Sequence, residues 1–178
     1  MSKRVLILSS SPRKGGNSET LCKEFFKGAS EANHQVELIS LREKKIDYCS
    51  GCYACKKSGK CAKSDDMSDV LDRMIAADVI VMATPVYFYT MCAQMKTVID
   101  RTVARYTKIS KKEFYFIATA AVGSKGALER TIEEFRGFMD CLNGAKEKGV
   151  IYGTSAWEIG DILKSRAMQQ AYEMGKAV

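Results

Sequence analysis

Four of the seven cysteines are grouped in one short segment, with the spacing Cys49-x2-Cys52-x2-Cys55-x5-Cys61. Three thiolates at two-residue intervals can ligate three corners of a cubane cluster, and a fourth after a short flexible stretch can complete the site. Zinc fits less well, because structural zinc sites usually join two separate Cys-x2-Cys knuckles. Free thiols and a reversible disulfide stay open as alternatives. The spacing therefore favours a metal or redox loop over residues 47–66.

A second polar segment covers residues 9–18, between an apolar run and the start of a helical pattern. Hydroxyls, two glycines and the amides of a helix start can bind a phosphate there. The segment lacks the Gly-Lys-Ser/Thr ending of a P-loop and the Gly-x-Gly-x-x-Gly of a dinucleotide site. A mononucleotide phosphate is favoured over an ordinary polar turn, and the candidate ligands are Ser9, Ser11, Arg13, Asn17 and Ser18.

A third segment, residues 84–90, follows the most apolar run of the chain and is rich in aromatic residues. Backbone amides beyond a proline can bond the polar edge of a flavin, and an aromatic side chain can pack on its ring. The alternative is that these aromatics only cover the top of the core. The candidate flavin contacts are Thr84, Pro85, Val86, Tyr87 and Phe88.

Elements that can position these segments alternate along the chain. Apolar runs predict strands, and between them apolar residues recur at helical spacing; the strands are expected near residues 4–8, 36–39, 79–83, 114–118 and 149–152. Such alternation indicates an α/β three-layer sandwich, a parallel sheet with helices on both faces. The flavodoxin-like order 2-1-3-4-5 is the commonest small one, with ligands at the carboxyl ends of strands 1 and 3. Residues 1–178 are expected to form a single domain.

Composition narrows the function classes. The net charge is +7, but the lysines are scattered and no helix shows a basic stripe, so nucleic acid is not an expected partner. The longest apolar stretch is far shorter than the about 20 residues that a bilayer needs. No export signal precedes the first strand, so we expect a cytoplasmic protein. His34, the only histidine, lies at a helix-to-strand turn, and no catalytic acid or base is nominated.

Together these segments resemble the NADPH-dependent FMN reductase superfamily of flavodoxin-like proteins, and within it the iron–sulfur flavoproteins. Residues 11–18 resemble the FMN-phosphate loop, although Ser10 stands where the family more often has glycine. Residues 84–88 resemble the isoalloxazine loop, and residues 95–101 the segment that packs behind it. The four clustered cysteines match the compact cluster spacing of the iron–sulfur members. By the same resemblance, Thr119 and Gly123 lie near the other edge of the flavin, and Trp157 lines the pocket or an interface.

The resemblance implies an FMN-dependent oxidoreductase in which the protein positions and tunes the cofactor. In one variant NAD(P)H reduces FMN, and a small quinone, flavin or nitro-type acceptor reoxidises it. In the other, a ferredoxin-like donor passes electrons through a 4Fe–4S cluster. The resemblance also implies a homodimer or homotetramer. The alternative of a non-enzymatic flavodoxin-type electron carrier is disfavoured because such carriers are typically acidic. The donor, the acceptor, the preference between NADH and NADPH, and the metal content stay open.

Overall fold

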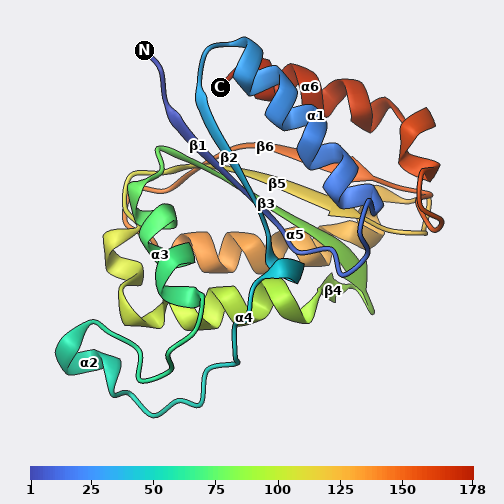
Figure 1. Ribbon diagram of the computed structural model, residues 1–178. Helices are drawn as coiled ribbons and strands as arrows, with labels where there is room; N and C mark the ends of the chain where they lie inside the picture. Colours follow the sequence, from blue (N-terminus) through green and yellow to red (C-terminus); the bar gives the residue numbers. More distant parts are fainter.

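The computed structural model describes all residues from 1 to 178, as one sheet between two layers of helices (Figure 1). The strands are β1 (Arg4–Ser9), β2 (Gln35–Ser40), β3 (Val79–Tyr87), β4 (Thr90–Met91), β5 (Glu113–Thr119) and β6 (Lys146–Gly153). The helices are α1 (Asn17–Glu31), α2 (Cys55–Ser58), α3 (Met67–Ala76), α4 (Ala93–Arg101), α5 (Lys125–Asp140) and α6 (Arg166–Lys176). Four short 3-10 turns complete the chain. No helix combines the length and the apolar character that crossing a membrane requires.

The sheet has the order β2-β1-β3-β5-β6, and every neighbouring pair on this path is parallel. Since β5 and β6 are the fourth and fifth parallel strands, the predicted flavodoxin-like order 2-1-3-4-5 is confirmed. The carboxyl ends of β1 and β3 therefore lie side by side at the point where the strand order reverses. This is where open α/β sheets bind their ligands.

One strand was not expected. β3 continues to Tyr87 and pairs with the antiparallel β4 through Val86 with Met91 and Tyr87 with Thr90. The two turn residues, Phe88 and Tyr89, both have positive φ values, of 51° and 65°. Two-residue hairpin turns of this hand favour Asn-Gly, and bulky residues adopt it only under strain. The predicted aromatic loop is thus a short, strained hairpin.

Each face of the sheet has its own core. Along β3, Val79 and Val81 face α1 and α6, whereas Ile80 and Met82 face α3, α4 and α5. All four side chains are fully buried, as expected for a central parallel strand covered on both faces. The predicted position of this strand in the middle of the sheet is confirmed.

Helices α1 and α6 touch backbone to backbone through two glycines. A Cβ atom at Gly28 would lie 2.1 Å from the carbonyl oxygen of Tyr172, and one at Gly175 would lie 2.2 Å from that of Phe25. Only glycine allows this approach. Because α1 begins at the predicted phosphate segment, the contact with α6 also fixes where that segment lies.

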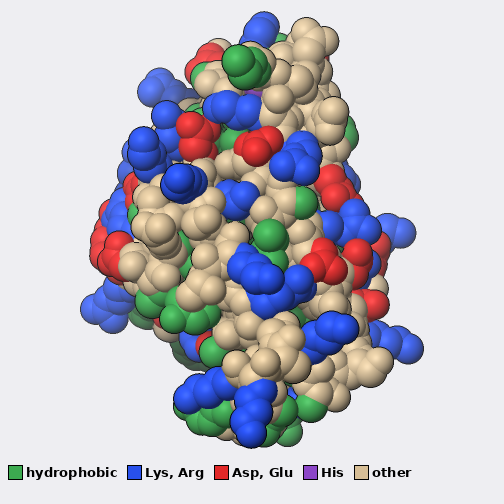
Figure 2. Space-filling model, turned by 90° about the vertical axis from the view of Figure 1, so that its left-hand side faces the viewer, with side chains coloured by type: hydrophobic (Ala, Val, Ile, Leu, Met, Phe, Trp, Pro, Cys, Tyr) green, Lys and Arg blue, Asp and Glu red, His purple; other side chains and the backbone are tan.

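The cysteine segment leaves the sheet after β2 and returns at α3. Figure 1 shows it, with α2 near its tip, extending away from the sheet beyond the end of α4 that is remote from β4. Figure 2 shows Lys and Arg side chains spread over the face of the molecule on this side. Lys56, Lys57 and Lys60 at the tip are all exposed. The loop therefore presents positive charge to solvent.

Candidate functional site

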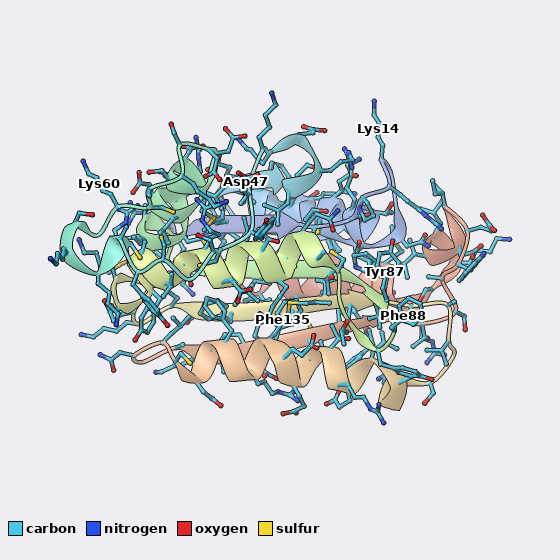
Figure 3. The ribbon with its side chains drawn as sticks, turned by 90° about the horizontal axis from the view of Figure 1, so that it is seen from below. Lys14, Asp47, Lys60, Tyr87, Phe88 and Phe135 are labelled. Atoms are coloured by element: carbon cyan, nitrogen blue, oxygen red, sulfur yellow. The ribbon has the colours of Figure 1, made fainter.

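A cleft of about 390 Å³ lies at the carboxyl ends of β1, β3 and β5. The structure brings together there most of the residues predicted to bind a cofactor, namely Ser11, Arg13, Asn17, Ser18, Pro85, Val86, Tyr87, Phe88 and Thr119. Figure 3 shows Tyr87 and Phe88 together at this end of the molecule. A cleft of this size falls within the range of small-molecule and cofactor sites.

Three predicted residues are not part of the cleft wall. Ser9 is buried within the sheet, and its hydroxyl has no hydrogen-bond partner. The hydroxyl of Thr84 donates to the carbonyl of Pro85 at 2.8 Å and accepts from the amide of Cys92 at 3.0 Å, so it braces the hairpin. Gly123 is exposed beyond the rim. Ser9 and Thr84 are buried, so they follow strands that lead to the cleft without lining it.

The first turn of α1 forms the polar floor of the cleft. Gly16, at its N-cap, offers no side-chain cap, and the first amides of a helix have no partner within it. The hydroxyl of Ser18 is buried and has no hydrogen-bond partner. A Cβ atom at Gly16 would lie 2.6 Å from the Ser11 hydroxyl oxygen and 3.1 Å from the Arg13 carbonyl oxygen, so the loop packs closely against the start of α1. Unpaired donors at a helix start form an anion site.

One buried acid lies beside this floor. Glu19 accepts hydrogen bonds from the Gly15 amide and from Arg42, both at 3.1 Å, and pairs with Lys23 at 2.9 Å. Burial alone would raise the pKa of the Glu19 carboxyl, but the hydrogen bonds from Lys23, Arg42 and Gly15 outweigh it, and the pKa is lowered. The carboxylate stays ionised, and its charge is balanced by Lys23 and Arg42. An anion in the cleft is therefore little repelled by Glu19.

The far wall comes from residues 154–162, which sequence patterns did not clearly assign. Ala156, Trp157 and Ile159 line the cleft there. Asn17, predicted to donate to a phosphate, lines the cleft and also ties this wall to α1. Its side-chain amide donates to the Glu158 carbonyl at 2.9 Å and accepts from the amides of Gly160 at 3.2 Å and Ile162 at 3.4 Å. Asn17 thus links this wall to α1 through long-range hydrogen bonds, a role that no local sequence pattern indicates.

Asn17→Ala should release the far wall. The substitution leaves the buried amide of Ile162, and the part-buried amide of Gly160 and carbonyl of Glu158, without their partner, and each loss of a buried partner costs about 1–3 kcal/mol. We expect a lower thermal midpoint and faster amide hydrogen exchange confined to residues 157–162. The matched control is Glu158→Ala, because Asn17 bonds the carbonyl of Glu158 and the side chain of Glu158 is exposed. Equal exchange rates in the two variants would show that the Asn17 side chain does not hold this wall in place.

A second cavity, of about 300 Å³, is lined by all four clustered cysteines together with Arg101. All four thiols are free, and no three of them approach closely enough to hold a metal ion as they stand. The amide of Ala54 and then the hydroxyl of Ser50 lower the pKa of the Cys52 thiol. Figure 3 shows Lys60 of this loop at the end of the molecule opposite Tyr87 and Phe88. The chain thus carries two separate candidate sites.

Comparison with known proteins gives one consistent result. The sequence matches the profile of the NADPH-dependent FMN reductase family over residues 3–147. It is 35% identical over 136 residues to an iron–sulfur flavoprotein of Methanocaldococcus jannaschii, a match that covers 76% of this chain and 70% of that one. It is 31% identical to an iron–sulfur flavoprotein of Archaeoglobus fulgidus, over 98% of this chain and 80% of that one.

Solved structures share the fold. An azoreductase from Bacillus anthracis superimposes with a TM-score of 0.75 at 18% identity, and the match covers 100% of both chains. An NAD(P)H:quinone oxidoreductase from Methanothermobacter marburgensis superimposes with a TM-score of 0.72 at 18% identity, over 99% of this chain and 96% of that one.

Proposed function

Because the chain belongs to the NADPH-dependent FMN reductase family, and is therefore a flavin-dependent oxidoreductase, we propose that the cleft between α1 and the β3–β4 hairpin holds its FMN. One observation carries this assignment. The unpartnered buried hydroxyl of Ser18, the uncapped start of α1 and the strained aromatic hairpin meet in a single cleft. Phosphate and flavin ring need these two kinds of surface, polar at one end and apolar at the other.

The residues divide between the two ends of the cofactor. Ser11, Ser18 and the first amides of α1 bind the phosphate, and Arg13 adds a positive charge. The hairpin segment Pro85–Phe88 and Thr119 hold the ring system from the side of the sheet. Trp157 and Phe88 line the same cleft and are 64% and 98% exposed, so their rings are free to cover the ring system from outside. Bound FMN supplies the redox chemistry, and the protein positions it.

We propose NAD(P)H as reductant and a small quinone, flavin or nitro-type compound as acceptor. The family match covers residues 3–147, and residues 1–178 form one sheet with this cleft at its carboxyl edge, so both substrates would reach the flavin through the same open cleft. The exposed rings of Tyr87, Phe88 and Trp157 at the rim suit planar aromatic substrates. The same apolar rim would serve as the contact between copies in a homodimer or homotetramer.

We also propose an iron–sulfur cluster at the four cysteines, fed by a ferredoxin-like donor. Three observations support it: the cysteines share one cavity, a buried cation lies beside them, and the relatives named above are iron–sulfur flavoproteins. Thiolates and a cluster are anionic, so Arg101 and the surrounding lysines offset their charge. The exposed thiols would have to draw together on binding. Exposed free thiols also suit a reducing compartment, and we propose the cytoplasm.

Quantifying flavin, iron and zinc in anaerobically purified protein, with its visible spectrum, tests both proposals. About one FMN and roughly four irons per chain, with broad absorption near 400 nm, would support the iron–sulfur form. FMN with turnover of NAD(P)H but no iron would support an NAD(P)H-dependent reductase without a cluster. A stable one-electron state with little NAD(P)H turnover would instead mean an electron carrier. Protein that takes up no added FMN would contradict the assignment of the cleft.

A further inference from the structure

Arg101, the last residue of α4, binds both ends of the cysteine loop. Its side chain is 1% exposed, and its Nη1 and Nη2 donate to the two carboxylate oxygens of Asp65 at 2.7 and 2.8 Å. Nη1 also donates to the carbonyl of Asp47 at 2.5 Å. Asp65 in turn accepts from the amide of Asp47 at 3.1 Å. Both ends of the loop, at Asp47 and Asp65, are therefore bound by the same guanidinium group.

The same guanidinium belongs to the wall of the cysteine cavity. Arg101 lines it beside Cys49, Cys52, Cys55 and Cys61, and it is the only cationic side chain among the fully buried residues. Its Nε is buried and has no hydrogen-bond partner. One guanidinium N–H is thus left without a partner in the wall of the cysteine cavity, while the charge of Arg101 is paired with Asp65.

A residue that only stabilised the loop would not need a buried arginine with an unpartnered N–H. A buried ion pair is weak evidence for stability, because the desolvation of both charges offsets most of their attraction. The planar fork of arginine, however, fixes two partners at set angles and still has a further N–H to offer. Hydrogen bonds to thiolate sulfur and nearby positive charge are the means by which a protein tunes a cysteine site.

We propose that Arg101 is the positioning residue of the cysteine loop: it anchors residues 47 and 65 and presents its remaining N–H to the thiols. From the resemblance to the family, residues 95–101 were expected to pack behind the flavin loop. The structure places Arg101 at the last residue of α4, in the wall of the cysteine cavity. The part of the inference that concerns iron rests on the proposed cluster, whereas the part that concerns loop geometry does not.

Four variants test the assignment. Arg101→Lys keeps a charge and loses the fork, and Arg101→Met loses both. Arg101→Met with Asp65→Asn removes both members of the buried pair, so that no buried charge stays unpaired and the protein can fold. Arg105→Met is the matched control, because Arg105 pairs with an exposed carboxylate of Asp72 next to the same loop.

In reduced, metal-free protein, we expect the Arg101→Lys and double variants to show at least about tenfold faster modification of the half-buried Cys55 thiol and tryptic cleavage at residues 56–63, because local opening exposes both. After anaerobic reconstitution their iron retention should fall about 10- to 100-fold, the range typical for residues that support metal ligands. FMN content should stay within twofold, and Arg105→Met should match the unsubstituted protein. A folded double variant with unchanged thiol, cleavage and iron values would overturn the proposal. If the unsubstituted chain takes up no iron, the proposed cluster is refuted. The rates of thiol modification and tryptic cleavage in metal-free protein still decide the role of Arg101.

Discussion

Gly28→Ala is expected to lower the free energy of unfolding by about 3 kcal/mol, although alanine normally favours a helix. The intrinsic preference for alanine adds only about 1 kcal/mol of stability. Against it, the new Cβ would meet the Tyr172 carbonyl oxygen at 2.1 Å, and backbone atoms cannot swing aside as a side-chain tip can. Helices α1 and α6 must therefore separate. For a chain of this length the thermal midpoint should fall by about 6–12 °C.

Gly137→Ala is the matched control for this effect. Gly137 also lies within a helix, α5, but it is exposed and a Cβ atom there would meet nothing within 4 Å. We expect this variant to be as stable as the unsubstituted protein or more stable by about 0.4–1 kcal/mol, because alanine restricts the unfolded chain. Thermal and urea unfolding of both variants supply the measurement. Equal stabilities would show that α1 and α6 do not depend on their glycine contact.

Ser18→Ala is expected to weaken FMN binding about 10- to 100-fold without destabilising the free protein. The Ser18 hydroxyl is buried and unpartnered, so its removal leaves no new unsatisfied group. A hydrogen bond to a charged phosphate contributes about 1.5–3 kcal/mol, which sets the expected loss of affinity. Fluorescence titration of FMN and the thermal midpoint of the FMN-free protein measure the two quantities separately.

Ser9→Ala is the control for Ser18. The hydroxyl of Ser9 is likewise buried and unpartnered, but Ser9 is not part of the cleft wall. Its removal should leave FMN affinity unchanged. If the two variants bind FMN equally well, the Ser18 hydroxyl does not touch the phosphate, and the floor of the cleft acts through backbone amides alone.

Patterns that depend on neighbours in the sequence predicted most of the fold. The apolar run of β3 correctly indicated a central strand, because burial on both faces leaves no alternation of polar residues. The hairpin after it was missed, because Phe88 and Tyr89 carry none of the Asn-Gly signal that normally marks such a turn. Its shape depends on how α5 and the sheet hold it. Tyr89, for example, is bound through its carbonyl by Thr131 at 3.1 Å.

The candidate site was predictable where a loop directly follows a strand. Residue types in the first loop led to Ser11 and Ser18, which line the cleft. Asn17 and Arg101 were given other roles, because their partners lie far away in the chain and no periodicity links them. A residue that joins distant segments becomes visible only when the fold has brought its partners together.

The separation of the two sites along α4 has a consequence for the order in which substrates bind. The helix has nine residues and is about 13 Å long, with the cleft near its start and the cysteine cavity near its end. NAD(P)H and an acceptor that share the cleft must take turns, which gives ping-pong kinetics. A protein donor on the basic loop would leave the cleft free, so donor and acceptor can occupy the enzyme together. Competitive inhibition of NAD(P)H oxidation by high acceptor concentrations, and its absence with a protein donor, would therefore report by which end electrons enter.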